Sequence, residues 1–179
     1  MKGRGGIIGG IITLVIGGAV FTVSKADIAK NFSKDTGLSQ EESQQYVENI
    51  TKDDLVSYDK LGSDFISDSQ DILGLSRDID CVNYTYEWET NTLSCEVGKL
   101  QLIRIGNDEK ELGNAYTTLA SKSASREDIS STISLIDKLN TDFRLEIVSR
   151  ILDSKTIDET RKTNSYNKAL LQSALESNK

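Results

Sequence analysis

Three aspartates with helical spacing are the residues whose pattern most suggests chemistry in this sequence. Asp64, Asp68 and Asp71 are separated by four and three positions, so they fall on one face of an expected helix. Carboxylates grouped in this way are the ligands that hard cations take. A solvated polar face gives the same pattern, and we favour that interpretation. The downstream Asp78 and Asp80 do not complete a calcium loop, because its turn glycine and closing glutamate are missing.

The absence of histidine restricts the catalytic chemistry open to this chain. There is no His among the 179 residues, which removes Ser-His and Cys-His nucleophile pairs, imidazole metal ligands and the usual proton shuttle near neutral pH. No motif assigns a catalytic, cofactor-binding or metal-binding residue. We therefore expect a protein that is not an enzyme and that uses no cofactor.

Residues 79–97 are the one part of the chain without a helical pattern. Tyr84, Tyr86 and Trp88 alternate with polar residues, a period of two that predicts a short β-hairpin or an irregular insertion. These aromatic side chains are candidates for the wall of a small-ligand pocket, and simple packing is the favoured alternative.

Cys81 and Cys95 lie in the same segment and are the only cysteines. A regular hairpin turning at Thr90-Asn91 would separate them by about 16 Å along the strand, whereas a disulfide needs Cα atoms within about 7 Å. Either the loop is wider and irregular, or the thiols are reduced. Two cysteines close in sequence, behind an export-type segment, favour the Cys81–Cys95 disulfide.

A recurring start signal indicates the helices that would carry these residues. A Ser or Thr followed three positions later by an acidic residue satisfies the first N–H groups of a helix. The chain carries this signal before four apolar-periodic series, at Ser39, Thr51, Ser125 and Thr156. The corresponding helices are expected over 39–50, 51–73, 125–152 and 156–179.

A fifth helix is expected around residues 102–119. Its apolar residues keep a seven-residue rhythm: Leu102, Ile105, Leu112, Tyr116 and Leu119. Gly98, Gly106 and Gly113 fall near one face, which suggests either close contact with a neighbouring helix or glycines that are simply tolerated at exposed positions. Short connections favour antiparallel neighbours. The expected fold class is mainly α: an antiparallel helical bundle or a long helical hairpin behind an N-terminal transmembrane helix.

The transmembrane helix is expected over residues 7–23. No charged residue occurs from Gly5 through Ser24, and the stretch is just long enough to cross a bilayer. We interpret residues 1–26 as an uncleaved signal-anchor, with a cleaved signal peptide as the alternative, and residues 27–179 as an acidic helical domain.

Small residues recur within the apolar stretch. Gly6, Gly10, Thr13 and Gly17 are spaced by four, three and four, so they would share one face of a helix. In lipid, small residues let two helices approach closely. We expect this face to pack against another transmembrane helix, either of a partner or of a second copy; the alternative is that the glycines only keep a short segment weakly hydrophobic.

Charge sets the expected partners and the side of the membrane. Of the 21 basic residues, Lys2, Arg4 and Lys25 lie within 1–26, so the remaining 18 face 28 acidic residues, a net charge of −10. That balance argues against nucleic-acid binding. Basic residues before the apolar stretch, together with the cysteines, favour a single-pass membrane protein with its domain on the extracytoplasmic side.

Three functions fit this organisation. The first is a membrane-anchored, non-enzymatic domain that binds a protein partner or scaffolds an assembly. The second is an extracytoplasmic sensor or binding domain for a small ligand. The third is a surface filament subunit: Lys2-Gly-Arg-Gly resembles the leader of a prepilin, although the acidic residue expected just inside the mature helix is missing.

Overall fold

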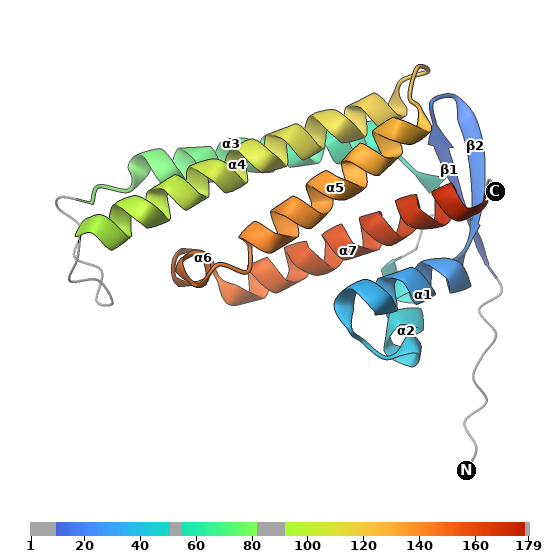
Figure 1. Cartoon of the computed structure of the whole chain (residues 1–179), viewed down its shortest axis with the longest axis horizontal. Coiled ribbons are helices and arrows are strands. Elements are labelled where there is room, and N and C mark those ends of the chain that lie inside the picture. The colour runs from blue at the N-terminus through green and yellow to red at the C-terminus, as the bar shows by residue number, and fades with distance from the viewer. Residues whose placement is uncertain (1–9, 51–54, 82–91, 178–179) are drawn as a thin grey trace, which may run out of the picture.

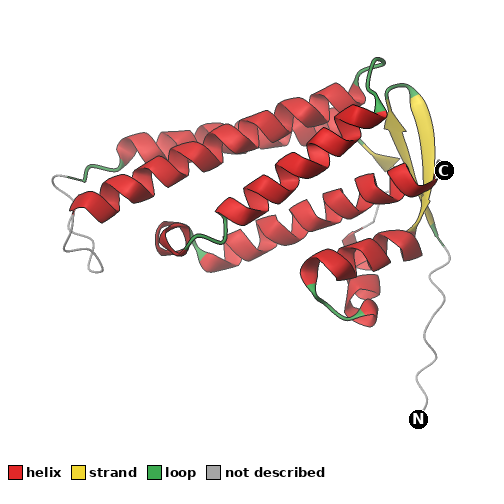
Figure 2. Ribbon diagram, viewed as in Figure 1, coloured by secondary structure: helices red, strands yellow, loops and turns green. Residues whose placement is uncertain are grey.

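The computed structural model describes residues 10–50, 55–81 and 92–177, which form a mainly helical fold. The elements follow in the order β1 (Ile11–Ile16), β2 (Ala19–Ser24), α1 (Lys25–Thr36), α2 (Gln40–Ile50), β3 (Leu55–Val56), α3 (Tyr58–Asp78), α4 (Thr92–Ala120), α5 (Arg126–Asp142), α6 (Glu146–Ile151) and α7 (Ser154–Ser177). The strands lie at one end of a bundle of long helices, with α1 and α2 near that end (Figures 1 and 2). The predicted mainly α class and the helical bundle are confirmed.

The helix predicted over residues 7–23 is wrong in the part of this stretch that the structure describes, which forms the antiparallel hairpin of β1 and β2. Gly17 and Gly18 make a two-residue turn between the paired Ile16 and Ala19, with φ of 61° and 75°. Two positive φ values are typical of a type I′ turn, whose twist matches that of the flanking strands. The glycine pair therefore reverses the chain here.

One face of the hairpin belongs to the main hydrophobic core. Side chains alternate along each strand, and the inward set is buried: Ile12, Leu14, Ile16, Phe21 and Val23. These residues share one core with side chains of all seven helices of the described residues. The turn is also held by a hydrogen bond, because the N–H of Gly17 donates to the carbonyl of Leu119, 3.1 Å away. None of the helices in the described ranges combines the length and apolar character of a membrane span.

The packing face predicted from Gly6, Gly10, Thr13 and Gly17 does not form within the described residues. Gly10 directly precedes β1, Thr13 pairs with Thr22 across the hairpin, and Gly17 is in the turn. Spacings of four, three and four share a face only in a helix, and here the chain is extended. Gly6 lies outside the described residues.

β3 adds a third strand, parallel to β1, with Thr13 opposite Leu55 and Leu14 opposite Val56. The strand order is β2-β1-β3. The helix predicted from Thr51 therefore begins later, at Tyr58, because the preceding residues pair with β1. Its cap is Ser57, whose hydroxyl accepts from the N–H of Lys60. Residues 51–54 lie outside the described ranges.

α3 and α4 form a long antiparallel pair with close backbone contact (Figure 1). A Cβ built on Gly113 would lie 2.8 Å from Cγ1 of Ile66, and one on Gly62 would lie 2.7 Å from the carbonyl oxygen of Gly113. A Cβ on Gly106 would likewise crowd Leu73. The close contact predicted for Gly106 and Gly113 is confirmed, and its partner is α3.

The single helix predicted over 125–152 is two helices. α5 ends at Asp142, and the chain turns through Phe143–Leu145 before α6 begins. The N–H of Leu145 donates to the carbonyl of Asp142, closing this turn. The turn lets Phe143 and Val148 both enter the core, although they belong to differently directed segments.

The predicted start signals coincide with observed helix starts where their reciprocal hydrogen bonds form. At α2, the carboxylate of Glu42 accepts from the N–H of Ser39 at 2.9 Å, and the N–H of Glu42 donates back at 3.2 Å. The same capping box links Ser125 and Asp128 at α5. α7 instead begins at Ser154, where the carboxylate of Asp153 accepts from the N–H of Thr156.

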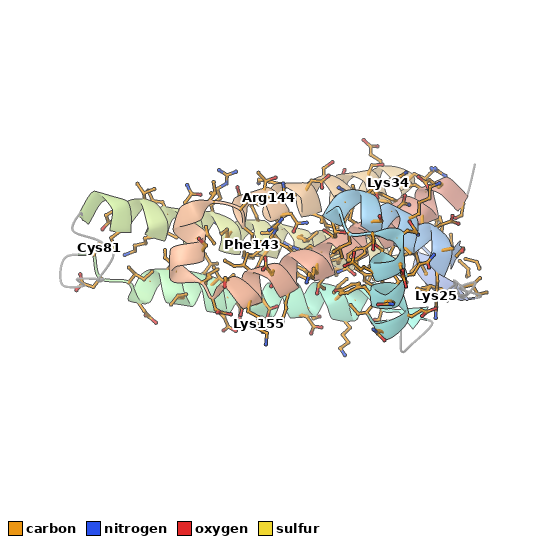
Figure 3. The ribbon with its side chains drawn as sticks, turned by 90° about the horizontal axis from the view of Figure 1, so that it is seen from below. Lys25, Lys34, Cys81, Phe143, Arg144 and Lys155 are labelled. Carbon is orange, nitrogen blue, oxygen red and sulfur yellow. A yellow bond between two sulfur atoms is a disulfide. The ribbon has the colours of Figure 1, made fainter. Side chains whose placement is uncertain are left out.

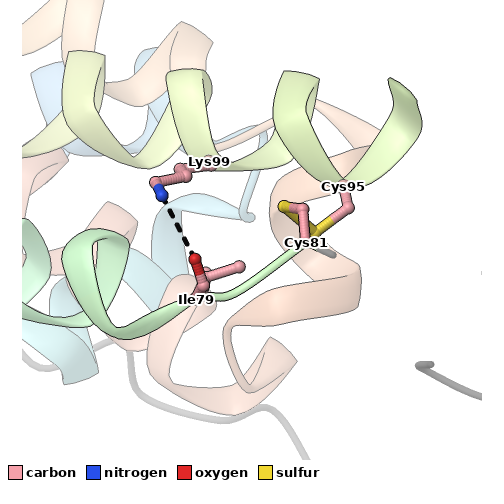
Figure 4. The surroundings of a disulfide bond; sticks show 4 residues. All are labelled: Ile79, Cys81, Cys95 and Lys99. Atoms are coloured by element: carbon pink, nitrogen blue, oxygen red, sulfur yellow. Dashed lines mark hydrogen bonds between the residues drawn. A yellow bond between two sulfur atoms is a disulfide. The ribbon is translucent and has the colours of Figure 1, made fainter. Parts of the chain in front are cut away.

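The Cys81–Cys95 disulfide is present and joins the segment after α3 to the first turn of α4 (Figure 4). The two Cα atoms are 5.6 Å apart, within the range that a disulfide spans. Beside it, the ammonium of Lys99 donates to the carbonyl of Ile79 at 3.1 Å. The return strand predicted after Thr90-Asn91 is wrong from residue 92 onward, because α4 has begun there.

Candidate functional site: an acidic cleft between two helices

A cleft of about 540 Å³ lies between α3 and α7, and we call it the acidic cleft. α3 packs on α4, α4 on α5, and α5 on α7, so α3 and α7 form two walls with α4 between them. Figure 3 views the bundle with α7 in front and labels Phe143 near the centre. The lining consists of Leu61, Asp64, Phe65, Asp68, Asp71, Ile72, Glu109, Phe143, Leu152, Thr156, Ile157, Glu159, Thr160, Thr163 and Asn164.

Five carboxyl groups line the acidic cleft, and no Lys or Arg is among its lining residues. Asp64, Asp68 and Asp71 are exposed side chains of α3, and Glu159 lies on the opposite wall, on α7. The α3 carboxylates rise along the helix axis in steps of about 6 and 4.5 Å. Burial, and then the neighbouring charges of Asp64 and Asp71, raise the pKa of Asp68. The cleft therefore has a strongly negative potential.

Glu109 is the unusual member of this set, because it is a buried acid and one of its carboxyl oxygens has no partner among the described residues. Its side chain is 3% exposed, and Oε2 has no hydrogen-bond partner among the described residues. Burial, and then the charge of Asp68, raise the pKa of Glu109 to about 8. A buried polar atom without a partner costs about 1–3 kcal/mol, and more when charged. A cation entering the cleft would supply the missing partner.

Asn164 contributes a second unsatisfied acceptor to the same cleft. Its Nδ2 donates to Oδ1 of Asn140 at 3.1 Å, while its own Oδ1 is buried and accepts no hydrogen bond from the described residues. Glu109 Oε2 and Asn164 Oδ1 thus both lack a hydrogen-bond donor. Ammonium and guanidinium groups are donors that carry a positive charge and have no acceptor capacity.

Apart from the carboxyl groups, Asn164 and three threonines, the lining of the cleft is apolar. Phe65, Phe143 and Ile157 are buried, and Ile72 and Leu152 are partly buried. Ligand sites typically combine such an apolar surface with a few placed polar groups, in volumes of about 300–1,000 Å³. The acidic cleft fits this description and suits a ligand that is both cationic and partly hydrocarbon.

The cleft is not arranged as a metal centre. In residues 10–50, 55–81 and 92–177, no group of three or more acidic or cysteine side chains is close enough to hold one metal ion. Asp64, Asp68 and Asp71 instead follow one another along α3. Their carboxylates can therefore contact several points of an elongated cation.

A second depression, of about 590 Å³, lies where α1, α5 and α7 meet, and it is lined by both signs of charge. Its Lys168 is bound to Asp35 and Asp137. The amide of Asn31 donates to Ser173 and to Glu176. Because these groups satisfy one another, this depression makes a weaker case for a ligand.

The candidate site residues predicted from the sequence differ in where they lie. Asp64, Asp68 and Asp71, interpreted as a solvated face, are solvent-exposed and also line the acidic cleft. Tyr84, Tyr86 and Trp88 lie outside the described residues. Glu109 was missed, although it leaves a signal: in the rhythm of Leu102, Ile105, Leu112, Tyr116 and Leu119, position 109 is the core position that holds an acid.

No protein-family model matches this chain, and neither the curated proteins nor the solved structures contain a significant match.

Proposed function

We propose that this protein is a non-enzymatic binding protein whose acidic cleft takes an organic cation. The observation that carries the proposal is Glu109, a carboxyl that is buried in the cleft wall with Oε2 unpaired. A bound ammonium would give Glu109 a hydrogen-bonded counterion and Asn164 Oδ1 a donor. Hydrogen bonds to charged groups contribute about 1.5–3 kcal/mol each, which is enough to make such a site specific.

Two further features support a binding role over a catalytic one. The chain has no His, so its carboxylates have no imidazole with which to share proton transfer. The cleft residues that carry hydroxyls are threonines on α7, and no basic side chain stands among the lining residues to activate one. The disulfide favours an oxidising compartment for this binding protein. The proposal includes no transmembrane anchor, because β1 and β2 occupy the described part of that stretch.

A thermal-unfolding experiment tests the proposal. Ligand at 100 times its dissociation constant stabilises the folded state by about 2.7 kcal/mol. We expect 1,4-diaminobutane to raise the melting temperature of the wild type, and succinate, a dianion of similar length, to leave it unchanged. Glu109→Gln should reduce the shift, whereas Glu96→Gln, an exposed site on the same helix, should retain it. An equal shift in both variants would mean general screening of charge and would refute the proposal.

A second candidate function, assembly with a protein partner, is favoured by the outer face of the sheet. Ile11, Val15 and Val20 are 58%, 42% and 67% exposed there, and Val15 pairs directly with Val20. Sedimentation of the wild type and of the double variant Val15→Thr, Val20→Thr tests whether copies of the chain assemble through this face. Threonine keeps the strand propensity, so loss of an assembled species would report the face itself.

A further inference from the structure

We propose that the cation bound by the acidic cleft is a linear polyamine, specifically a triamine with three- and four-carbon spacers. The inference rests on the proposed function and names its ligand class. It draws on three observations: the spacing of the α3 carboxylates, the unpaired acceptors of Glu109 and Asn164, and the absence of any basic side chain from the lining.

The spacing of charge along α3 matches that of the triamine. Asp64, Asp68 and Asp71 rise along the axis by about 6 and then 4.5 Å, about 10.5 Å in all. In an extended chain, ammonium nitrogens separated by four and three carbons lie about 6 and 5 Å apart, about 11 Å in all, from ordinary bond lengths. Each ammonium can therefore lie beside one carboxylate of the row.

The surfaces between the charges also match. The methylene spacers of a polyamine are hydrocarbon, and Leu61, Phe65 and Ile72 lie on the same wall as the aspartates. Glu109 and Asn164 each offer a buried oxygen without a donor. Protonated amines carry only donors, so they satisfy these oxygens without bringing an acceptor that would itself need a partner.

Other cations fit the acidic cleft less well. A free amino acid such as arginine brings an α-carboxylate, and no Lys or Arg lines the cleft to receive it. A metal ion needs clustered ligands, and the described residues contain no such cluster. A basic peptide brings backbone carbonyls that need donors, and the lining supplies few apart from threonine hydroxyls.

Calorimetric titration of the full chain compares spermidine with bis(hexamethylene)triamine, which has three amines at wider spacing. The structure gives an expected preference for spermidine of at least about tenfold, since one misplaced charged hydrogen bond is worth that factor. Asp68→Asn should weaken spermidine binding by about tenfold, and Glu96→Gln should not change it.

The outcomes separate this inference from the proposed function. Equal binding of the two triamines, or tighter binding of a tetralysine peptide, would overturn the polyamine assignment. If Glu109→Gln still weakened the binding of those triamines or of the peptide, the cleft would remain a cation site of another class. Binding of no cation, or binding that Glu109→Gln leaves unchanged, would overturn both.

Discussion

Replacing Glu109 with glutamine should change how the stability of the protein depends on pH. The folded-state pKa of Glu109 is about 8 and its ordinary value is 4.5. Between these values the unfolded chain loses the proton while the folded chain keeps it, so the free energy of unfolding falls as pH rises. From pH 5 to pH 8 this one group should remove about 3.5 kcal/mol of stability, at 1.36 kcal/mol per pH unit. Glutamine does not titrate, so the Glu109→Gln variant does not lose this stability between pH 5 and pH 8.

Urea unfolding followed by circular dichroism, at pH 5, 6, 7 and 8, measures this difference. The disulfide stays oxidised throughout, and Glu96→Gln serves as the control because Glu96 is exposed on the same helix. We compare the free energy of unfolding of Glu109→Gln with that of the wild type at each pH. The advantage of Glu109→Gln should be larger at pH 8 than at pH 5 by about 3 kcal/mol or more. Parallel stability curves for the wild type and Glu109→Gln would refute the assignment of Glu109 as a buried, unpaired acid.

Three further predictions test the fold that holds the cleft. Gly113→Ala should lower the free energy of unfolding by about 1–3 kcal/mol, because its Cβ would crowd α3, whereas Gly74→Ala, with nothing within 4 Å, should raise it by about 0.5–1 kcal/mol; equal effects in urea would contradict the close α3–α4 contact. Gly17→Ala should cost about 2 kcal/mol or more, from the positive φ and the neighbouring backbone, whereas a helix there would gain stability from alanine. Reducing Cys81–Cys95, which are 14 positions apart, should cost about 3 kcal/mol, and an unchanged urea midpoint would contradict a stabilising bond.

The sequence predicted the start of a helix well where the two residues of a capping box lie within one turn of each other. Ser39 and Glu42 satisfy each other within one turn, so the start of α2 needs no knowledge of the rest of the fold. The break between α5 and α6 could not be predicted in the same way. Apolar residues continue with helical period across Phe143, and only the position of the core shows that the chain must turn there.

The N-terminal hairpin was missed because two interpretations of one stretch compete. An uninterrupted apolar series predicts a membrane helix, yet Gly17-Gly18 between two runs of β-branched residues is also a two-residue turn signal. Burial decides between them: one face of the hairpin completes the core formed with the helices. That information comes from residues far away in the sequence.

Only one wall of the acidic cleft could be predicted from the sequence. The row of Asp64, Asp68 and Asp71 was found, but its opposing wall on α7 lies some 90 positions further along the chain, and pairing them needs the fold. Glu109 could have been singled out, since an acid at a core position of a regular apolar rhythm asks for an explanation. The cleft supplies that explanation.

The most direct test of a cation bound by Glu109 is the number of protons released on binding. Titration calorimetry of the wild type with spermidine at pH 7, in buffers of different ionisation enthalpy, gives this number. A group with a pKa of about 8 is about nine-tenths protonated at pH 7, so pairing it with an ammonium should release about 0.9 proton per ligand. Release near that value would place the cation against Glu109. Binding without proton release would contradict the central claim, because the buried carboxyl would have kept its proton and its unpaired oxygen.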